Sequence, residues 1–95
     1  MTQAQETGLV QRIFVDVKNS VVHLQMKEDP TVRVFKVDIS NHEPKSNSAL
    51  LLTSPGDHVN FKYWPTRHNF VTAGDISQWT NISIGLCSED TSDRL

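Results

Sequence analysis

The sequence predicts an all-β fold, a small antiparallel β-sandwich or barrel of about seven short strands with at most one short helical turn. Three observations support this prediction. Apolar and polar side chains alternate over several short stretches, turn residues separate these stretches, and no segment carries apolar residues at helical spacing over three turns. A chain of 95 residues has room for one core only, so we expect a single β domain.

The first half of the chain contains three predicted strands. Residues 9–17 form the first, in which Phe14 faces away from the main apolar row. The second strand alternates most regularly, and its inner row consists of Val22, Leu24 and Met26. A third strand at residues 31–39 is rich in β-branched residues and has apolar residues on both sides, which is typical of a central strand.

Four further strands are predicted in the second half, at residues 49–53, 58–64, 70–73 and 80–87. Pro55 and Gly56 occupy the central positions of a predicted type II turn between two of them. An aspartate followed three positions later by a glutamine resembles a capping box, which predicts a single helical turn over residues 75–79. The last strand has its predicted inner row at Ile82, Ile84 and Leu86.

The two ends of the chain are polar and differ from the region between them. We therefore expect an N-terminal arm at residues 1–8, a β domain at residues 9–87 and a C-terminal tail at residues 88–95. In an assembly, these ends would act as arms that contact neighbouring subunits.

Charge and composition weigh against several classes of partner. The formal net charge is −2 and no basic run occurs, so we expect neither nucleic-acid binding nor attachment to a membrane surface. The opening segment has no features of a signal peptide, and Cys87 is the only cysteine. These features predict synthesis in a reducing cytoplasm, without an intramolecular disulfide.

No motif for a cofactor or a metal is present. The four histidines lack the close spacing of ligand pairs, and no glycine-rich loop could cradle a phosphate. We therefore expect no cofactor, no metal and no small-molecule substrate.

Cys87 raises the alternative of a thiol enzyme. The segment Ser83-Ile84-Gly85-Leu86-Cys87-Ser88 resembles the catalytic segment of the L,D-transpeptidase family. In that family, however, a glycine directly precedes the cysteine and an arginine follows it, and both are missing here. This difference favours a structural thiol and a protein that is not an enzyme.

Aromatic and apolar residues of the second half form the predicted protein interface. Its aromatic patch consists of Tyr63, Trp64 and Trp79, with Arg67 and His68 nearby. Leu50 and Leu52 belong to the apolar strand at residues 49–53, which could add to the sheet edge of a partner.

These features predict a non-enzymatic structural protein that binds neighbouring protein subunits as a homo-oligomer or in a larger assembly. Residues 25–37 are similar to the N-terminal β-domains of phage baseplate upper proteins. By analogy with other small, cysteine-poor β modules, the hypothesis is a subunit of a viral or phage particle, either a capsid decoration protein or a tail or baseplate component. The alternative is a small inhibitor or adaptor that binds one host protein through Trp64 and Arg67.

Overall fold

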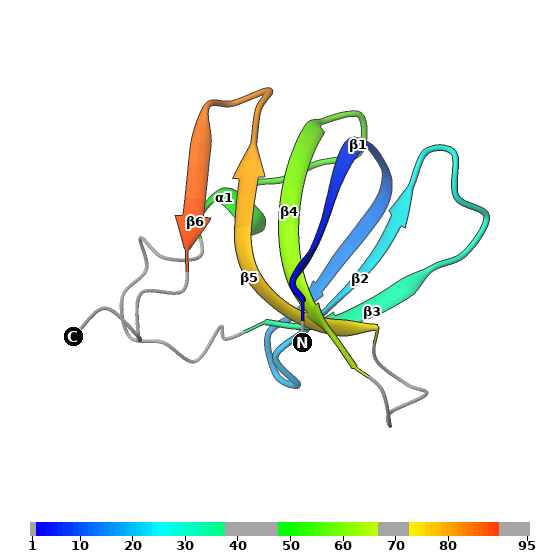
Figure 1. Ribbon diagram of the computed structural model, residues 1–95. Coiled ribbons are helices and arrows are strands. Elements are labelled where there is room, and N and C mark those ends of the chain that lie inside the picture. Colours follow the sequence, from blue (N-terminus) through cyan, green and yellow to red (C-terminus); the bar gives the residue numbers. More distant parts are fainter. Residues whose placement is uncertain (1, 38–47, 67–72, 90–95) are drawn as a thin grey trace.

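The computed structural model describes residues 2–37, 48–66 and 73–89, and these residues form a β-barrel with one short helix (Figure 1). The all-β prediction is confirmed, and the sheet closes on itself as a barrel. In chain order the elements are β1 (Ala4–Asp16), β2 (Val21–Met26), β3 (Arg33–Lys36), α1 (Ser48–Leu51), β4 (His58–Pro65), β5 (Gly74–Asn81) and β6 (Leu86–Glu89).

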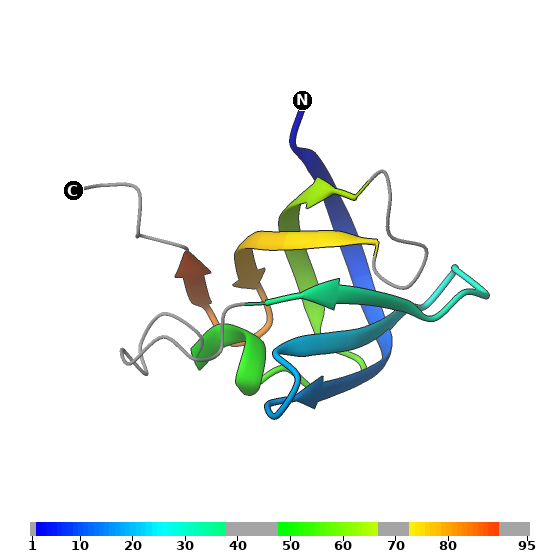
Figure 2. The same cartoon turned by 90° about the horizontal axis from the view of Figure 1, so that it is seen from below.

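The strands lie in the order β3-β2-β1-β4-β5-β6, and all neighbours in this order are antiparallel. A parallel pairing of β3 with β5, at Phe35 with Gly74 and at Lys36 with Asp75, closes the ring. The barrel therefore has five strands, β1 to β5, and β6 extends the sheet beyond β5. Figure 2 shows this arrangement from below.

Closure of the barrel depends on a glycine. A Cβ atom on Gly74 would overlap the carbonyl oxygen of Trp64 and would lie only 2.8 Å from the Tyr63 ring. Only a residue without a side chain allows β5 to approach β4 this closely while it also pairs with β3.

The core lies inside the barrel and confirms several predicted side-chain directions. The predicted inner row of β2 is buried, as are Val59 and Phe61 of β4. Phe35 packs edge-on against Phe61, with 5.6 Å between the ring centroids. The predicted turn before β4 also forms, with Gly56 at φ 92° and the Asp57 amide donating to the Ser54 carbonyl at 3.1 Å.

The predicted strand at residues 49–53 is wrong, because this segment contains the helix α1. Ala49 and Leu50 are buried on the inner side of the helix. The Ala49 amide donates to the Ser88 hydroxyl of β6 at 2.9 Å, and the Thr53 hydroxyl donates to the Ala49 carbonyl at 2.7 Å. A short apolar run is compatible with either a strand or a buried helix, and here contacts with β5 and β6 favour the helix.

Two predictions near the C-terminal end are also wrong. Residues 75–79 form part of β5 rather than a helical turn. The predicted strand at residues 80–87 is interrupted by a turn between β5 and β6, in which Gly85 has φ 71°. The predicted inner row is exposed as a result: Ile82 by 48%, Ile84 by 44% and Leu86 by 37%.

The described residues also shift the expected boundaries of the domain. Residues 4–8 belong to β1 and pair with β4, so they are part of the barrel and not a free arm. At the other end, Ser88 and Glu89 belong to β6. The predicted strand at residues 70–73 and the last residues of the predicted tail lie largely outside the described part of the chain.

Candidate functional site

The predicted aromatic patch does not come together on the surface. Trp79 is buried, stacks on Phe61 with 5.0 Å between ring centroids, and donates its Nε1 hydrogen to the Thr53 hydroxyl at 3.0 Å. Tyr63 is half-buried and packs on Phe35, also at 5.0 Å, whereas Trp64 is exposed on the other face of β4. Trp79 is therefore a core residue, which corrects its prediction as an interface residue.

The other predicted interface residues are separated as well. Leu50 is buried on the inner side of α1, so it is not available to a partner, whereas Leu52 follows the helix and is exposed. Arg67 and His68 lie outside the described residues. The structure thus leaves Trp64 and Leu52 as exposed members of the predicted set, on different elements.

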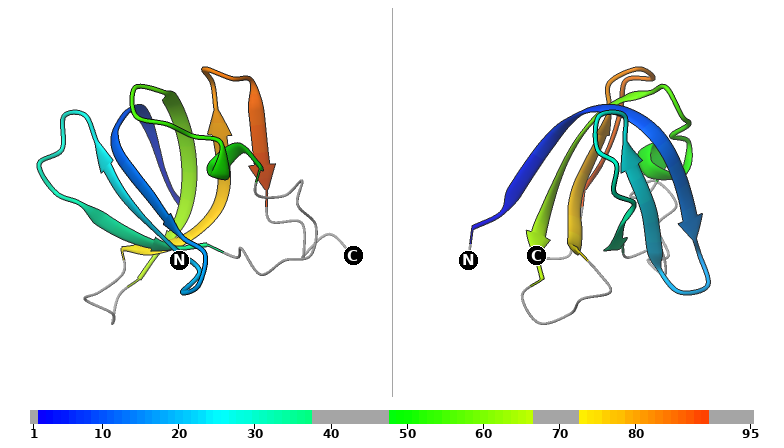
Figure 3. Two further views of the ribbon diagram at one scale, coloured as in Figure 1. Left: turned by 180° about the vertical axis from the view of Figure 1, so that it is seen from behind. Right: turned by 90° about the vertical axis from the view of Figure 1, so that its right-hand side faces the viewer.

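A more coherent site lies along β1, which pairs with different strands over its two halves. Residues 4–9 pair with β4, whereas pairing with β2 begins only at Val10 and Met26. Figure 3 (right) shows β1 arching over the barrel, so that its first half departs from β2. Within the described residues, no strand pairs with the first half of β1 on the side where β2 would lie.

Backbone groups of this half-strand point toward the open side. The Leu9 carbonyl accepts a hydrogen bond from the Lys27 amide at 2.9 Å, so Leu9 directs its backbone groups toward the β2 side. Because these directions alternate along a strand, Thr7 and Gln5 direct their amides and carbonyls to the same side. We define the open edge of β1 as residues 4–8, in which Gln5 and Thr7 direct their backbone amides and carbonyls away from β4.

A groove of about 420 Å³ adjoins the open edge. One wall is β1 and the other is the end of β2 with the β2–β3 connection. The lining residues are Glu6, Thr7, Gly8, Leu9, Met26, Lys27, Glu28 and Asp29. Leu9 is 39% exposed, and the groove is therefore partly apolar with a charged rim.

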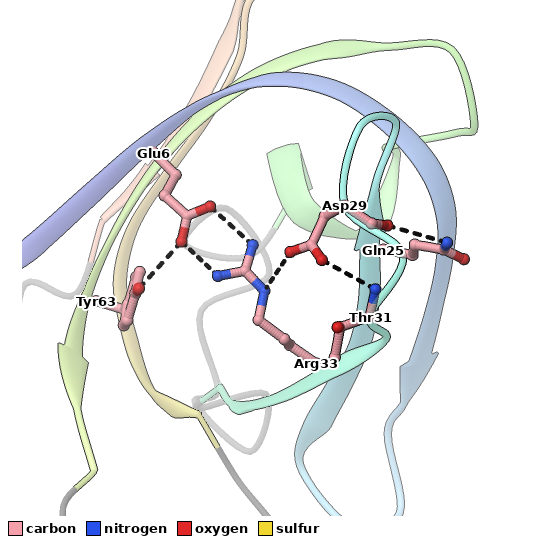
Figure 4. A network of polar contacts seen from close by, with 6 residues as sticks. All are labelled: Glu6, Gln25, Asp29, Thr31, Arg33 and Tyr63. Atoms are coloured by element: carbon pink, nitrogen blue, oxygen red, sulfur yellow. Dashed lines mark hydrogen bonds and ion pairs between the residues drawn. The ribbon is translucent and has the colours of Figure 1, made fainter.

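An ion pair inside the barrel mouth holds the two walls of the groove together (Figure 4). Arg33 of β3 donates to both carboxylate oxygens of Glu6 of β1, at 2.5 and 2.7 Å, and the Tyr63 hydroxyl donates to Glu6 at 3.0 Å. Asp29 lies 3.5 Å from Arg33 Nε and accepts a hydrogen bond from the Thr31 amide at 2.9 Å. The pair thus connects the first half of β1, which does not pair with β2, to β3 at Arg33, which pairs with Leu24 of β2.

This network changes the acid–base behaviour of its members. The hydrogen bonds and positive charge of Arg33 lower the pKa of Glu6 below its ordinary value, although partial burial opposes this shift. Burial, followed by the hydrogen bond to Glu6, raises the pKa of Tyr63. Glu6 is therefore held ionised and Tyr63 neutral, which suits a structural bridge.

A second free strand edge lies on β6. This strand pairs with β5 along one edge, and no strand in the described part of the chain pairs with its other edge. Leu86 and Cys87 of β6 are exposed, and the preceding turn exposes Ile82 and Ile84. We call residues 82–87 the β5–β6 hairpin tip.

The described surroundings of Cys87 are polar and neutral. Its sulfur lies 3.3 Å from the Thr80 hydroxyl and 3.6 Å from the Gln78 amide nitrogen. Residues 2–37, 48–66 and 73–89 contain no group of three or more histidine, cysteine, aspartate or glutamate side chains placed to hold a metal ion. The helix in this part of the chain is too short to span a membrane.

Comparison with protein-family models, with curated proteins and with solved structures gives no match to this chain. Because no comparison points to a ligand, the outer face of β1, β2 and β3 has to be judged by its own residues.

That outer face carries one strongly exposed aromatic ring. Phe14 is 62% exposed and lies 5.8 Å from the His23 ring, and the exposed cations of the same face include Arg12 on β1 and Lys36 on β3. Binding of a single nucleic-acid strand usually combines several stacking rings with a positive groove. One exposed phenylalanine on a chain of net charge −2 is a weak basis for such binding.

Proposed function

We propose that this protein is a non-enzymatic assembly subunit, whose barrel binds a neighbouring protein by accepting an extended strand along the open edge of β1. The observation that carries the proposal is the coincidence of this edge with a groove of about 420 Å³. The incoming strand would take the place that β2 leaves after Met26. In strand addition, backbone hydrogen bonds supply affinity and alternate side chains supply specificity.

The charges of the groove indicate which strands it prefers. Glu6, Glu28 and Asp29 contribute three negative charges, whereas Lys27 and the neighbouring Arg33 contribute two positive ones. The excess of one negative charge favours a strand with basic flanks. Leu9 and Met26 offer apolar contacts to a side chain between these flanks.

A role in a viral or phage particle is a narrower form of this proposal. A capsid decoration, tail or baseplate subunit would use the open edge to bind another particle protein. An adaptor of one host protein could use the same edge, and in that case the bound strand would come from the host protein.

A peptide titration tests the proposal. The probe is a soluble peptide of alternating threonine and valine with a lysine at each end, and the readout is the NMR shift of each backbone amide. We expect the largest shifts at Gln5 and Thr7, because their amides would bond to the peptide. Thr7→Pro removes one of these donors without removing a backbone hydrogen bond to β4, and should weaken binding about tenfold. Like Thr7→Val, it also removes the hydroxyl that accepts from the Asn60 side chain of β4, so the two variants share this loss.

Two variants serve as controls. Thr7→Val retains the backbone amide and should bind like the unmodified protein, and Phe14→Ser changes an exposed side chain on the remote outer face. The circular dichroism spectrum of Thr7→Pro establishes that its barrel is intact. Shifts centred on Phe14 and His23, or no binding at peptide concentrations of about 1 mM, would refute strand addition at β1.

A further inference from the structure

Two inward side-chain positions of the open edge differ in their surroundings. Glu6 turns toward the barrel mouth, where it bonds to Arg33 and Tyr63. Gly8 faces the same way, because it lies two positions further along the strand, and a Cβ atom on Gly8 would lie 3.2 Å from the Met26 methyl group. Residues opposite each other in paired strands direct their side chains to the same face. A bound strand would therefore place one inward side chain beside Glu6 and the next against Met26.

The charges at the barrel mouth are not balanced among the described residues. Arg33 lies between Glu6 on one wall and Asp29 on the other, as Figure 4 shows, so that two carboxylates share one guanidinium. The hydrogen bond from Arg33 lowers the pKa of Glu6, whereas the nearby charge of Asp29 opposes this shift. A second cation at this place would therefore be attracted by the remaining negative charge.

Asp29 is the carboxylate of this pair that has hydrogen-bonding capacity left. Both carboxylate oxygens of Glu6 accept from Arg33. In Asp29, by contrast, Oδ1 accepts from the Thr31 amide, and Oδ2 lies 3.5 Å from Arg33 Nε without forming a hydrogen bond to it. An ionised carboxylate accepts up to about four hydrogen bonds, and the Asp29 side chain is 34% exposed. Its Oδ2 can thus accept from a ligand in the groove, which Asp29 lines.

From these contacts we infer that Asp29 selects the bound strand by pairing with one of its lysine or arginine residues, which lies opposite Glu6. This inference rests on the proposed strand addition and adds the chemistry of the partner. Glu6 already matches the charge of Arg33, so the new cation completes a second ion pair. The next inward residue of the strand, opposite Gly8, is apolar because it packs against Met26. The partner is therefore a protein segment in which one position separates a basic residue from an apolar one.

Two peptides that carry one lysine at different places test the inference. Both alternate threonine and valine, and the lysine replaces either a central valine or a central threonine. The valine row should face inward because valine suits the contact with Met26, so only a lysine of that row reaches Asp29. Relative to a peptide without lysine, we expect the lysine in the valine row to tighten binding about fivefold and the lysine in the threonine row to have little effect. NMR titration of the backbone amides gives the dissociation constants.

Two variants of the protein separate a specific ion pair from a general effect of charge. Asp29→Asn removes the charge, keeps an oxygen that can accept from the Thr31 amide, and should abolish the gain from the lysine. Glu28→Gln removes the same charge from the neighbouring exposed position and should retain the gain. Circular dichroism spectra establish that both variants have an intact barrel.

Three results would overturn the inference. The lysine in the valine row could give no gain, the gain could be equal in both rows, or it could survive in Asp29→Asn. If the peptides still shift the amides of Gln5 and Thr7 in these cases, the proposed function stands and only the role of Asp29 is wrong. If no peptide shifts these amides at about 1 mM, the proposed function is refuted and the inference falls with it.

Discussion

The two ends of the barrel are sealed in different ways. At the α1 end, the Thr53 hydroxyl accepts hydrogen bonds from Trp79 at 3.0 Å and from Asn81 at 3.1 Å, and all three residues are buried. At the groove end, the ion pair of Glu6 and Arg33 keeps part of its surface in water, with side-chain exposures of 32% and 20%. One end is therefore a network of buried neutral side chains that reaches the Asp57 carboxylate through Asn81, and the other is a partly exposed charged bridge.

Because of this difference, we expect the α1 end to contribute more to stability than the groove end. Polar groups buried without water depend on their partners, so the α1 end should tolerate little change. A partly exposed ion pair contributes less, because water and salt screen it. In the proposed strand addition, the groove end would change shape while the α1 end keeps the barrel folded.

The largest expected effect is at the core of the α1 end. Trp79→Ala should lower the free energy of unfolding by about 3–5 kcal/mol, since it removes a fully buried ring and leaves a cavity. Urea denaturation measures this change. Trp64→Ala, at an exposed position of β4, is the control and should have a much smaller effect. Equal losses in the two variants would contradict the buried position of Trp79.

A smaller loss is expected from the hydrogen bonds of the same end. Thr53→Val removes the acceptor of Trp79 Nε1 and one of the two acceptors of Asn81 Nδ2, which keeps Asp57. It should cost about 1–3 kcal/mol in urea denaturation, because the buried Trp79 donor loses its partner. Thr53→Ser keeps the hydroxyl and should retain most of the stability. If the serine variant is as unstable as the valine variant, the hydroxyl is not what stabilises this end.

The smallest effect is expected at the groove end and depends on pH. Because Arg33 lowers the pKa of Glu6 in the folded protein, the unfolded chain binds the proton more readily. The stabilisation by ionised Glu6 is thus present above the ordinary value of 4.5 and is lost as the pH falls through the lower folded pKa. Glu6→Gln should cost about 1 kcal/mol at neutral pH and flatten this acid dependence.

Thermal unfolding between about pH 7 and pH 3 measures the difference. Glu28→Gln removes the same charge from an exposed position of the groove wall and serves as the control. An acid dependence that is identical in Glu6→Gln and in the unmodified protein would show that the ion pair does not bridge the groove end in solution.

Local sequence patterns correctly predicted much of the barrel. The alternation at Val22, Leu24 and Met26 predicted the inner face of β2, and the same pattern placed Val59 and Phe61 inside. The proline and glycine before β4 predicted the turn. In these segments the local preference and the tertiary packing agree, which is why a single sequence reveals them.

The remaining elements depend on contacts that a local pattern does not contain. Asn81 has an amide oxygen that accepts the Ile84 amide at 3.2 Å, and this bond helps to form the turn that exposes a row predicted to be internal. The candidate site was missed because Glu6 and Thr7 lie in a polar segment that resembles a free arm. An ion pair with Arg33 holds Glu6 in the barrel, and a local pattern cannot show this contact because the two residues are far apart in the sequence.

The parallel pairing that closes the barrel has a consequence for folding during synthesis. Phe35 and Lys36 find their partners at Gly74 and Asp75, so this contact waits until most of the chain has left the ribosome. Until then β3 is paired only with β2. The segment between β3 and β5 has to lose conformational entropy before the closing contacts can form. The nascent chain is therefore most exposed to aggregation just before β5 is available to pair.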